Sequence, residues 1–339
     1  MRRAFLWLFV AALLASCQPA AARLSPTRAA RPGPRETPGS RPPTSTPAAP
    51  PTRAPATGSR PAPTSTPLPV AADDLNILLL GTDRRIGAAE GPAQWRTDTL
   101  IVVAVRPRAR RVAMLSIPRD LWVTIPGHGE GRINVADSLG EKRDGPGGGP
   151  ALVAATLQEN LGIPIQAYMR VHFQGLEQII DALGGVTITS DRAFSEWMDD
   201  WSGERLVHVQ VVTGTQRMDG QTALGYARSR STTSDFDRSR RQQQILLAIR
   251  DAALRPEVVP RLPQLLPALL DAVDTDLPVT RVLSLAGLAL RLRPQDYDGR
   301  VFDSTMVTDW VTPEGAMVLL PNRPRIEEVW AELTQAPGS

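Results

Sequence analysis

The chain has 339 residues, enough for one large folded domain with additional segments, and its 38 lysine and arginine residues slightly outnumber its 35 acidic residues. It contains a single cysteine and three histidines, so it cannot form an internal disulfide and offers no histidine–cysteine set typical of zinc sites. It has neither a Gly-x-Ser-x-Gly elbow nor a P-loop. These absences argue against a serine hydrolase of that type and against a P-loop nucleotidase.

Residues 1–16 have the pattern of a bacterial secretory signal. Arg2 and Arg3 precede an apolar run from Ala4 to Ala15, which is shorter than the roughly 20 residues that a membrane span needs. The run leads directly into Cys17, and this junction resembles the lipobox of bacterial lipoproteins. We therefore expect a lipoprotein signal peptide and lipidation at Cys17. The alternatives are an uncleaved anchor and an ordinary buried cysteine.

Residues 17–72 are expected to form a disordered Pro/Arg-rich tether. Fifteen of the 32 prolines fall in residues 18–71, where large apolar residues are few. The same stretch holds seven arginines and one glutamate, and with the signal set aside, the rest of the chain keeps 29 basic and 34 acidic residues. The positive charge thus belongs to the tether, which can lie against an anionic membrane or wall polymers. An exported acidic domain argues against nucleic acid as a partner.

Apolar runs alternate with helical patterns over residues 73–255, which predicts an α/β or α+β domain with a sheet between helices. We expect strands at 76–80, 99–105, 112–117, 165–171, 186–189 and 207–212. We expect helices at 151–161, 173–183, 221–227 and 238–254. The glycine-rich residues 144–150 predict a loop. Residues 256–339 are expected to form a mainly helical C-terminal extension, with helices at 262–272, 281–292 and 326–333 and a short strand at 301–302.

Arginines and aspartates occur where apolar strands begin or end. Asp83 follows the first predicted strand, Asp98 precedes the second, and Arg119 and Asp120 follow the third. Ligands of open α/β sheets bind at strand ends. Arginines neutralise a diphosphate, and carboxylates hold Mg²⁺ through oxygen. The combination predicts a site for a phosphate and a divalent cation.

A second basic group lies later in the chain. Residues 228–241 hold five arginines and two aspartates. A helix beginning near Asp237 would place Arg238, Arg241 and Gln242 on its apolar face. Buried arginines are costly unless a counter-charge is present, so this pattern predicts a polyanionic ligand. The alternative is a solvated basic start of a helix with Asp237 as its N-cap.

Several ordered motifs together resemble the LytR-CpsA-Psr family. They are NILLLGTD at 76–83, RTDT at 96–99, LSIPRD at 115–120, RIN at 132–134, NLGIP at 160–164, DALGGV at 181–186 and the arginine-rich stretch at 224–244. The resemblance implies a mixed sheet flanked by helices, with an apolar groove for a lipid tail. It also implies transfer of a glycopolymer from a polyprenyl-diphosphate carrier to peptidoglycan, with release of the lipid phosphate and help from Mg²⁺ or Mn²⁺.

The resemblance also assigns roles to individual residues. Asp83 and Asp98 would hold the metal, and one of them, or a water that they orient, would help to deprotonate the attacking sugar hydroxyl. The groups expected to grip the diphosphate are Arg85, Arg96, Arg119, Arg228, Arg230, Arg238, Arg241 and Gln242. The residues expected to orient them are Asp120, Asp235 and Phe236. The candidate catalytic residues among all of these are Asp83, Asp98, Arg119, Arg228, Arg230 and Arg238.

Two positions depart from the family pattern. Asp237 stands where the family usually has glycine in its Asp-Phe-Gly-Arg segment, and its carboxylate would either weaken diphosphate binding or cap the helix. After Asn134, residues 135–138 read Val-Ala-Asp-Ser in place of an Ala-Tyr or similar aromatic step. This second departure puts contacts with the acceptor in doubt more than it does the metal site.

The expected protein is therefore a lipid-anchored enzyme on the outer face of the cytoplasmic membrane. Its expected partners are a polyprenyl-diphosphate-linked glycan and peptidoglycan. Two alternatives remain open from sequence. One is a polyprenyl-diphosphate hydrolase that uses the same residues with water as acceptor. The other is a non-catalytic cell-wall-binding or regulatory lipoprotein.

Overall fold

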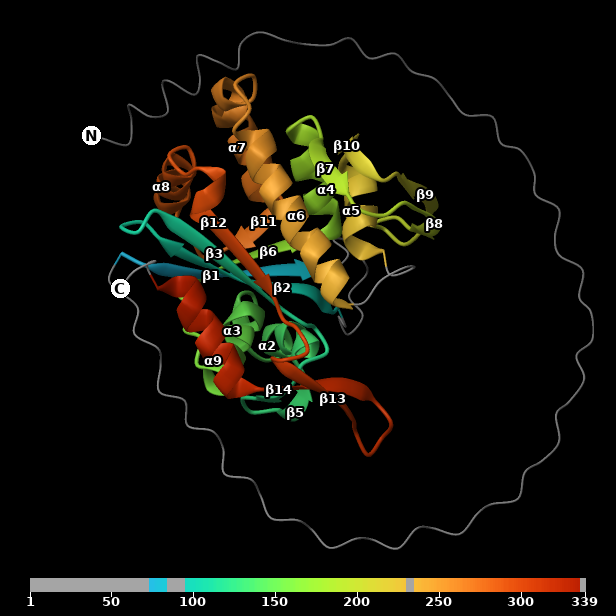
Figure 1. Cartoon of the computed structure of the whole chain (residues 1–339), viewed down its shortest axis with the longest axis vertical. Coiled ribbons are helices and arrows are strands. Elements are labelled where there is room, and N and C mark those ends of the chain that lie inside the picture. Colours follow the sequence, from blue (N-terminus) through green and yellow to red (C-terminus); the bar gives the residue numbers. More distant parts are fainter. Residues whose placement is uncertain (1–72, 84–94, 230–234, 336–339) are drawn as a thin grey trace, which may run out of the picture. The chain divides into compact units, whose positions relative to one another are not determined.

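A six-stranded mixed sheet forms the centre of the structure, with strand order β11-β6-β1-β2-β3-β12 (Figure 1). The structure is a computed structural model that describes residues 73–83, 95–229 and 235–335. These residues belong to one compact unit that spans residues 60–339. The predictions for the signal peptide, Cys17 and the tether lie outside the described residues, as do those for Arg85 and Arg230.

Three consecutive antiparallel strands make up the middle of this sheet. They are β1 (Leu75–Thr82), β2 (Thr97–Arg106) and β3 (Arg111–Ile117). Apolar side chains on both faces explain why these strands read as nearly continuous hydrophobic runs. The basic turn between β2 and β3 is tight, and Arg110 adopts a positive φ of 51° in it. The three strands confirm the prediction from sequence.

The segment after residue 255 completes the sheet at both edges. Strand β6 (Ala167–His172) lies parallel to β1, and β11 (Val273–Thr275) pairs with it in antiparallel orientation. At the opposite edge, β12 (Tyr297–Val301) runs parallel to β3. The expected helical extension is therefore built into the same sheet as the residues before it. The short strand expected at 301–302 overlaps only the last residue of β12, and β11 was not predicted, because both strands are short and carry no clear alternating apolar pattern.

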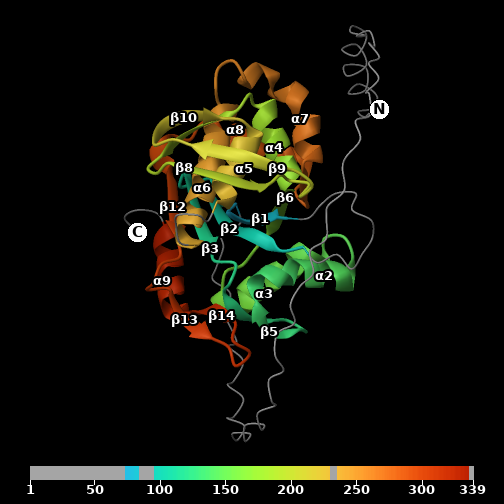
Figure 2. The same cartoon turned by 90° about the vertical axis from the view of Figure 1, so that its right-hand side faces the viewer.

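Helices cover the sheet on both faces, which confirms the predicted fold class (Figures 1 and 2). One face carries α2 (Ala136–Asp144), α3 (Gly148–Leu161) and α9 (Arg323–Thr334). The opposite face carries α4 (Phe173–Ala182), α5 (Gly220–Arg228), α6 (Asp235–Ala253), α7 (Leu262–Asp271) and α8 (Val279–Ala289). Within the described residues, no helix is both long and apolar enough to cross a membrane.

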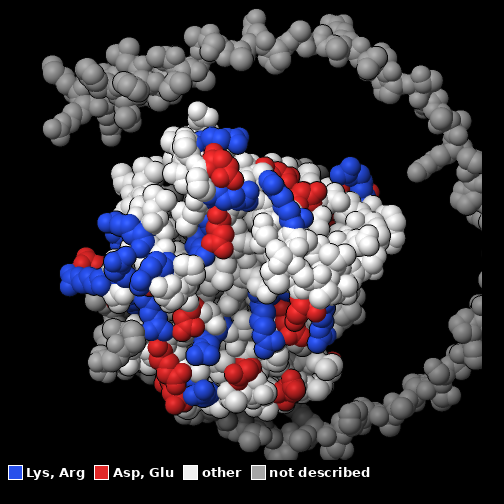
Figure 3. All heavy atoms as spheres, turned by 45° about the horizontal axis from the view of Figure 1, so that its top comes forward, with Lys and Arg blue, Asp and Glu red and all other residues white. Residues whose placement is uncertain are grey.

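Four small hairpins or strand pairs surround this core. They are β4 (Trp122–Ile125) with β5 (Gly129–Arg132), β7 (Val186–Ser190) with β10 (Gly214–Met218), β8 (Phe194–Asp199) with β9 (Leu206–Val211), and β13 (Val307–Val311) with β14 (Met317–Pro321). Only β7 and β9 were predicted. Residues 144–150 were expected to be a loop, but Asp144 ends α2 and Gly148 begins α3, so only residues 145–147 lie between the two helices. Acidic and basic side chains are interspersed on the face shown in Figure 3.

The end of the chain contributes directly to the main core. Trp330 on α9 is only 2% exposed and packs in the same apolar cluster as Leu80 and Leu115 of the sheet. We expect Trp330→Ala to lower the free energy of unfolding by about 3–5 kcal/mol, measured by urea denaturation. The matched control is Trp310→Ala, because Trp310 is 36% exposed on the β13 strand. Equal effects of the two substitutions would contradict the assignment of α9 to the core.

Candidate functional site

A cavity of about 660 Å³ lies between the central sheet and helices α4, α5 and α6. Most of its wall is apolar, and the wall includes Met169, Val171, Leu176, Ile179, Leu246 and Ile249. The same cavity is lined by five polar or charged residues predicted for the site, namely Asp83, Asp98, Arg228, Arg238 and Gln242. One cavity thus combines an apolar wall with a cluster of charged side chains, the Arg–Asp group, which consists of Asp83, Asp98, Arg228 and Arg238.

Asp83 is held at the end of β1 by the start of β2. The backbone N–H of Arg96 donates to Asp83 Oδ1 at 2.6 Å, and the N–H of Asp83 donates to the carbonyl of Arg96 at 3.2 Å. Gly81 permits this close approach, because a Cβ there would lie 2.8 Å from the Cβ of Thr99. Burial raises the pKa of Asp83, and the nearby charge of Asp98 adds to the shift. The two carboxylates therefore face a common site.

Asp98 is fixed from the other side by Arg119. The β2–β3 register, in which Leu100 pairs with Ile117, brings the two residues together, and Arg119 Nη1 donates to Asp98 Oδ1 at 2.6 Å. Arg119 also approaches Asp120, with 3.3 Å between Nε and Oδ2. Burial alone would lower the pKa of Arg119, but the hydrogen bond and charge of Asp98 outweigh it and raise the pKa. Arg119 therefore remains a cation beside the cavity.

Arg228 ends helix α5 and reaches the same group of charges. Its guanidinium lies 4.6 Å from the ring centre of Phe173 and donates to the carbonyl of Asp199 at 2.6 Å. Burial lowers the pKa of Arg228, although nearby carboxylates, Asp98 and Asp83 among them, oppose the shift. Sequence reasoning missed Phe173 and Asp199, because neither a cation–π contact nor a backbone acceptor has a sequence signature.

Helix α6 confirms that arginines lie on an inward-facing stripe. Arg238 is 4% exposed and pairs with Asp235, with 2.9 Å between Nη1 and Oδ1. Arg241 is also buried, but its Nε donates to the carbonyl of Tyr226 at 3.0 Å, so it joins α6 to α5. It lines a second, smaller cavity of about 100 Å³. Of the expected diphosphate ligands on α6, Arg238 and Gln242 therefore line the large cavity.

Two other predicted residues have local structural partners. Phe236 packs against the apolar cluster on the α2–α3 side of the sheet. Asp237 lies inside the first turn of α6 and not at its N-cap, and its Oδ1 pairs with Arg240 Nη1 at 2.6 Å. The Asp237 departure from the family pattern thus adds an i,i+3 ion pair on a half-exposed part of the helix.

Asp83 and Asp98 fit a metal that is shared with an anionic ligand. In the described residues, no group of three or more His, Cys, Asp or Glu side chains is arranged to hold a metal ion. Mg²⁺, however, is commonly bound by one or two carboxylates together with waters and substrate phosphates. The carboxylates of Asp83 and Asp98 act on each other electrostatically at the edge of a cavity that also holds arginines. Two carboxylates alone would be an incomplete donor set for Mg²⁺, and phosphate oxygens of a ligand would complete it.

The fold is a mixed α/β sheet covered by helices, and its large cavity has an apolar wall next to arginine and aspartate side chains. The sequence belongs to the LytR_cpsA_psr family, whose family model matches residues 55–335.

The chain is similar to the polyisoprenyl-teichoic acid–peptidoglycan teichoic acid transferase TagU of Oceanobacillus iheyensis. The two are 36% identical over 215 residues, which is 63% of this chain and 62% of that protein. It is 34% identical over 229 residues to the regulatory protein MsrR of Staphylococcus aureus, covering 66% of this chain and 63% of the relative. The chain therefore spans less than two thirds of the length of these relatives.

A solved structure supports the same relationship. It is the LytR-CPS2A-psr family protein YwtF (TagT) with a bound octaprenyl pyrophosphate lipid. The superposition has a TM-score of 0.55 with 25% sequence identity, and covers 79% of this chain and 92% of TagT.

Proposed function

We propose that this protein transfers a glycopolymer from a polyprenyl-diphosphate carrier to peptidoglycan. The observation that carries the proposal is the single cavity in which apolar walls and the Arg–Asp group meet. The apolar part has the character required by a polyprenyl tail, and the arginines have the charge required by a diphosphate. The TagU name and the octaprenyl pyrophosphate bound to TagT support the same substrate class.

In the proposed reaction the cavity residues bind the diphosphate, deprotonate the acceptor hydroxyl and stabilise the leaving lipid phosphate. Arg228 and Arg238 bind the diphosphate oxygens and stabilise the charge that develops on the leaving lipid phosphate. An acceptor hydroxyl on peptidoglycan attacks the sugar-linked phosphorus, and the bond from that phosphorus to the bridging oxygen breaks. Asp83 accepts the hydroxyl proton, directly or through a water. The products are a phosphodiester-linked polymer and polyprenyl phosphate.

We propose that Asp83 and Asp98 also hold Mg²⁺ or Mn²⁺ against the diphosphate. When bound, the ion supplies positive charge that offsets the charge of the diphosphate. Arg119 keeps the Asp98 carboxylate in place through its 2.6 Å hydrogen bond. The Arg96 amide does the same for Asp83, with a donor–acceptor distance of 2.6 Å. The protein contributes mainly orientation and electrostatics, without a covalent intermediate.

We propose that this reaction takes place at a membrane to which the N-terminal segment anchors the protein. The signal pattern over residues 1–16, the lipobox-like junction at Cys17 and the proline-rich residues up to 72 support a lipid-anchored protein on the extracytoplasmic face. A polyprenyl-linked donor resides in that membrane, so anchoring keeps the enzyme near its substrate. Mass spectrometry of the mature N-terminus tests whether Cys17 carries the lipid.

A transfer assay with the full chain in detergent separates the proposed activity from its alternatives. The donor is a synthetic polyprenyl-diphosphate glycan, and polyprenyl phosphate release is measured with and without peptidoglycan. A transferase releases lipid phosphate in proportion to polymer that appears on peptidoglycan. Equal release without peptidoglycan would instead identify a hydrolase. Absence of release, together with tight binding to bare peptidoglycan, would support a binding or regulatory protein.

The apolar wall has its own test. Ile249→Arg places a cation on the surface that we assign to the polyprenyl tail. We expect the KM for a long-chain donor to rise about tenfold or more, equivalent to at least about 1.4 kcal/mol of binding free energy. A short-chain, water-soluble donor should be affected much less. Leu283→Arg is the control, because Leu283 is an exposed apolar residue of α8. Equal loss with both donors would argue against a tail-binding wall.

A further inference from the structure

A buried ionic network lies on the side of the sheet opposite the cavity. Met169 and Val171 of β6 line the cavity, and the alternation of side chains along a strand directs Arg170 to the other face. There Arg170 meets Asp137 and Glu141 of helix α2, with N–O distances of 3.0 Å for each pair. None of these three residues belongs to the cavity described above.

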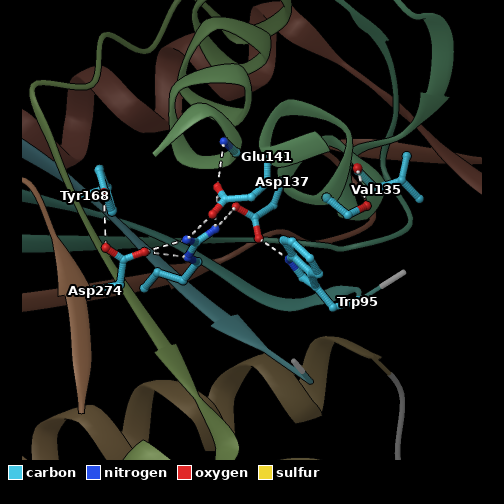
Figure 4. Close-up of polar contacts among 9 residues, drawn as sticks. Trp95, Val135, Asp137, Glu141, Tyr168 and Asp274 are labelled. Carbon is cyan, nitrogen blue, oxygen red and sulfur yellow. Dashed lines mark hydrogen bonds and ion pairs between the residues drawn. The ribbon is translucent and has the colours of Figure 1, made fainter. Parts of the chain in front are cut away.

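The network is closed by residues from two further parts of the chain. Asp274 of β11 lies 2.5 Å from Arg170, and the hydroxyl of Tyr168 donates to Asp274 at 3.3 Å. Figure 4 shows Asp137, Glu141 and Asp274 together, with Trp95 beside Asp137. The indole Nε1 of Trp95 donates to Asp137 Oδ2 at 2.5 Å.

Burial gives these contacts a large energetic weight. The side chain of Asp137 is fully buried and that of Arg170 is 6% exposed. Burial raises the pKa of Asp137, while Arg170 and the indole N–H oppose that shift. Removing one partner from a buried ionic group is far more costly than losing a surface ion pair. The contacts between Asp137, Arg170 and Trp95 therefore fix the positions of the elements that carry them.

Helix α3 begins with glycines that lie in close contact with the carboxylates of Asp137 and Glu141. The backbone N–H of Gly149 donates to Glu141 Oε2 at 3.2 Å. A Cβ on Gly149 would lie 2.4 Å from both the carbonyl oxygen and Oδ1 of Asp137. The glycine-rich start of α3 thus lets the helix backbone approach α2 closely. The segment is helical from Gly148 although its composition is typical of a loop.

The network is connected to the proposed metal site through the peptide bond between Trp95 and Arg96. Trp95, anchored on Asp137, directly precedes Arg96, whose amide N–H holds the carboxylate of Asp83. Thr97, the next residue, is buried and pairs with Thr82 at the end of β1. The start of β2 is thus held by side-chain contacts beneath the sheet and by backbone contacts with β1. A shift at Trp95 would move the Arg96 amide with it.

We propose that Trp95, Asp137 and Arg170 are positioning residues that hold the Arg96 amide, and through it Asp83, in the geometry needed opposite Asp98. This inference rests on the proposed role of Asp83 and Asp98 as metal-holding carboxylates. It gives a role to Asp137, one of the residues 135–138 whose departure from the family pattern was expected to affect contacts with the acceptor. The side chain of Asp137 is fully buried and contacts Trp95 and Arg170.

The test compares Trp95→Phe and Asp137→Asn with Trp122→Phe in the full chain. Trp95→Phe removes the indole donor and keeps an aromatic ring, while Asp137→Asn leaves Glu141 and Asp274 as counter-charges for Arg170. Trp122→Phe is matched chemically, because the indole of Trp122 donates only at an exposed position, 3.5 Å from Glu130. Thermal unfolding of each variant establishes that it is folded.

Two measurements are made on each variant. Hydrogen exchange of the peptide covering residues 95–99 reports how firmly the Arg96 amide is held. Titration with Mn²⁺ alone, followed by electron paramagnetic resonance, reports metal affinity. We expect exchange at this peptide to accelerate about tenfold or more in Trp95→Phe and Asp137→Asn, and the Kd for Mn²⁺ to rise about 10–100-fold, the range typical of residues that orient metal ligands. Trp122→Phe should leave both measurements unchanged.

The two readouts separate failure of this inference from failure of the proposed function. Unchanged exchange in Trp95→Phe and Asp137→Asn would overturn the positioning role, and so would equal acceleration in Trp122→Phe. If the unsubstituted protein does not bind Mn²⁺, the metal-holding role of Asp83 and Asp98 fails, and with it the catalytic meaning of the network. If Mn²⁺ binds equally well to all proteins while exchange changes, Trp95 positions the chain without serving the metal, which also overturns the inference.

Discussion

Replacing Arg238 by alanine is expected to lower the kcat/KM of glycopolymer transfer by about a hundred- to a thousandfold. Arg238 is buried and lines the large cavity beside its apolar wall. A preorganised cation in such a site stabilises charge that develops in the transition state, and loss of one comparable donor typically costs two to three orders of magnitude in rate. The measurement is polyprenyl phosphate release at limiting donor concentration.

The neighbouring Arg240→Ala substitution provides the matched control. Arg240 is on the same helix, but its side chain is 64% exposed and pairs with Asp237. Loss of an exposed ion pair changes stability by at most about 1 kcal/mol and should not change the rate of transfer more than slightly. Near-normal transfer by a folded Arg238→Ala protein would contradict the diphosphate-binding role. A similar loss of transfer activity in Arg240→Ala would indicate that the total positive charge of the helix, and not the position of Arg238, determines the rate.

The orientation of Arg238 could be predicted because helix periodicity is a local property. A repeat of 3.6 residues places Arg238 and Arg241 on the same face as Ile245, and that face is buried in the structure. The same reasoning could not separate the two arginines. Arg238 lines the large cavity, whereas Arg241 donates to a carbonyl of α5. That difference depends on how α5 packs against α6, which no periodicity in either helix encodes.

The meeting of Asp83 and Asp98 was also within reach of sequence reasoning. Both residues flank strong apolar runs, and strand-end residues gather at one edge of a sheet. Their contacts with Arg119 and Arg96, however, follow from the register of β1, β2 and β3. A shift of one residue in that register would turn the side chains to the other face. Sequence therefore predicted that Asp83 and Asp98 lie close together, but it did not determine their hydrogen bonds.

The buried network around Arg170 could not be predicted from the sequence, for a different reason. Its members are separated by up to about 180 positions, from Trp95 to Asp274, and come from elements with no common motif. Strand β11 itself is three residues long and too short to show alternation. Only the pairing of β11 and β6 brings Asp274 to Arg170. The residues after 255 therefore support the proposed site, although they contain none of the motifs that located it.

Asp98→Asn is expected to reduce transfer by at least about a hundredfold and to raise the metal concentration needed for half-maximal activity. The substitution keeps the shape of the side chain and removes the charge that we assign to metal binding. It also weakens the 2.6 Å contact with Arg119, which loses a charged partner. Loss of a metal-holding carboxylate and mispositioning of a nearby cation act in the same direction. Rates at increasing Mg²⁺ after chelation with EDTA provide the measurement.

Asp298→Asn is the matched control for this effect. Asp298 lies on β12 and accepts a hydrogen bond from Arg111 at 2.9 Å, so it forms the same type of pair at the opposite end of β3 from Arg119. Its substitution should leave both the rate and the metal requirement unchanged. A wild-type protein that is indifferent to EDTA would remove the metal from the mechanism. If Asp98→Asn is slow even then, the residue acts by orienting Arg119 toward the diphosphate, and the arginines alone carry the electrostatic stabilisation.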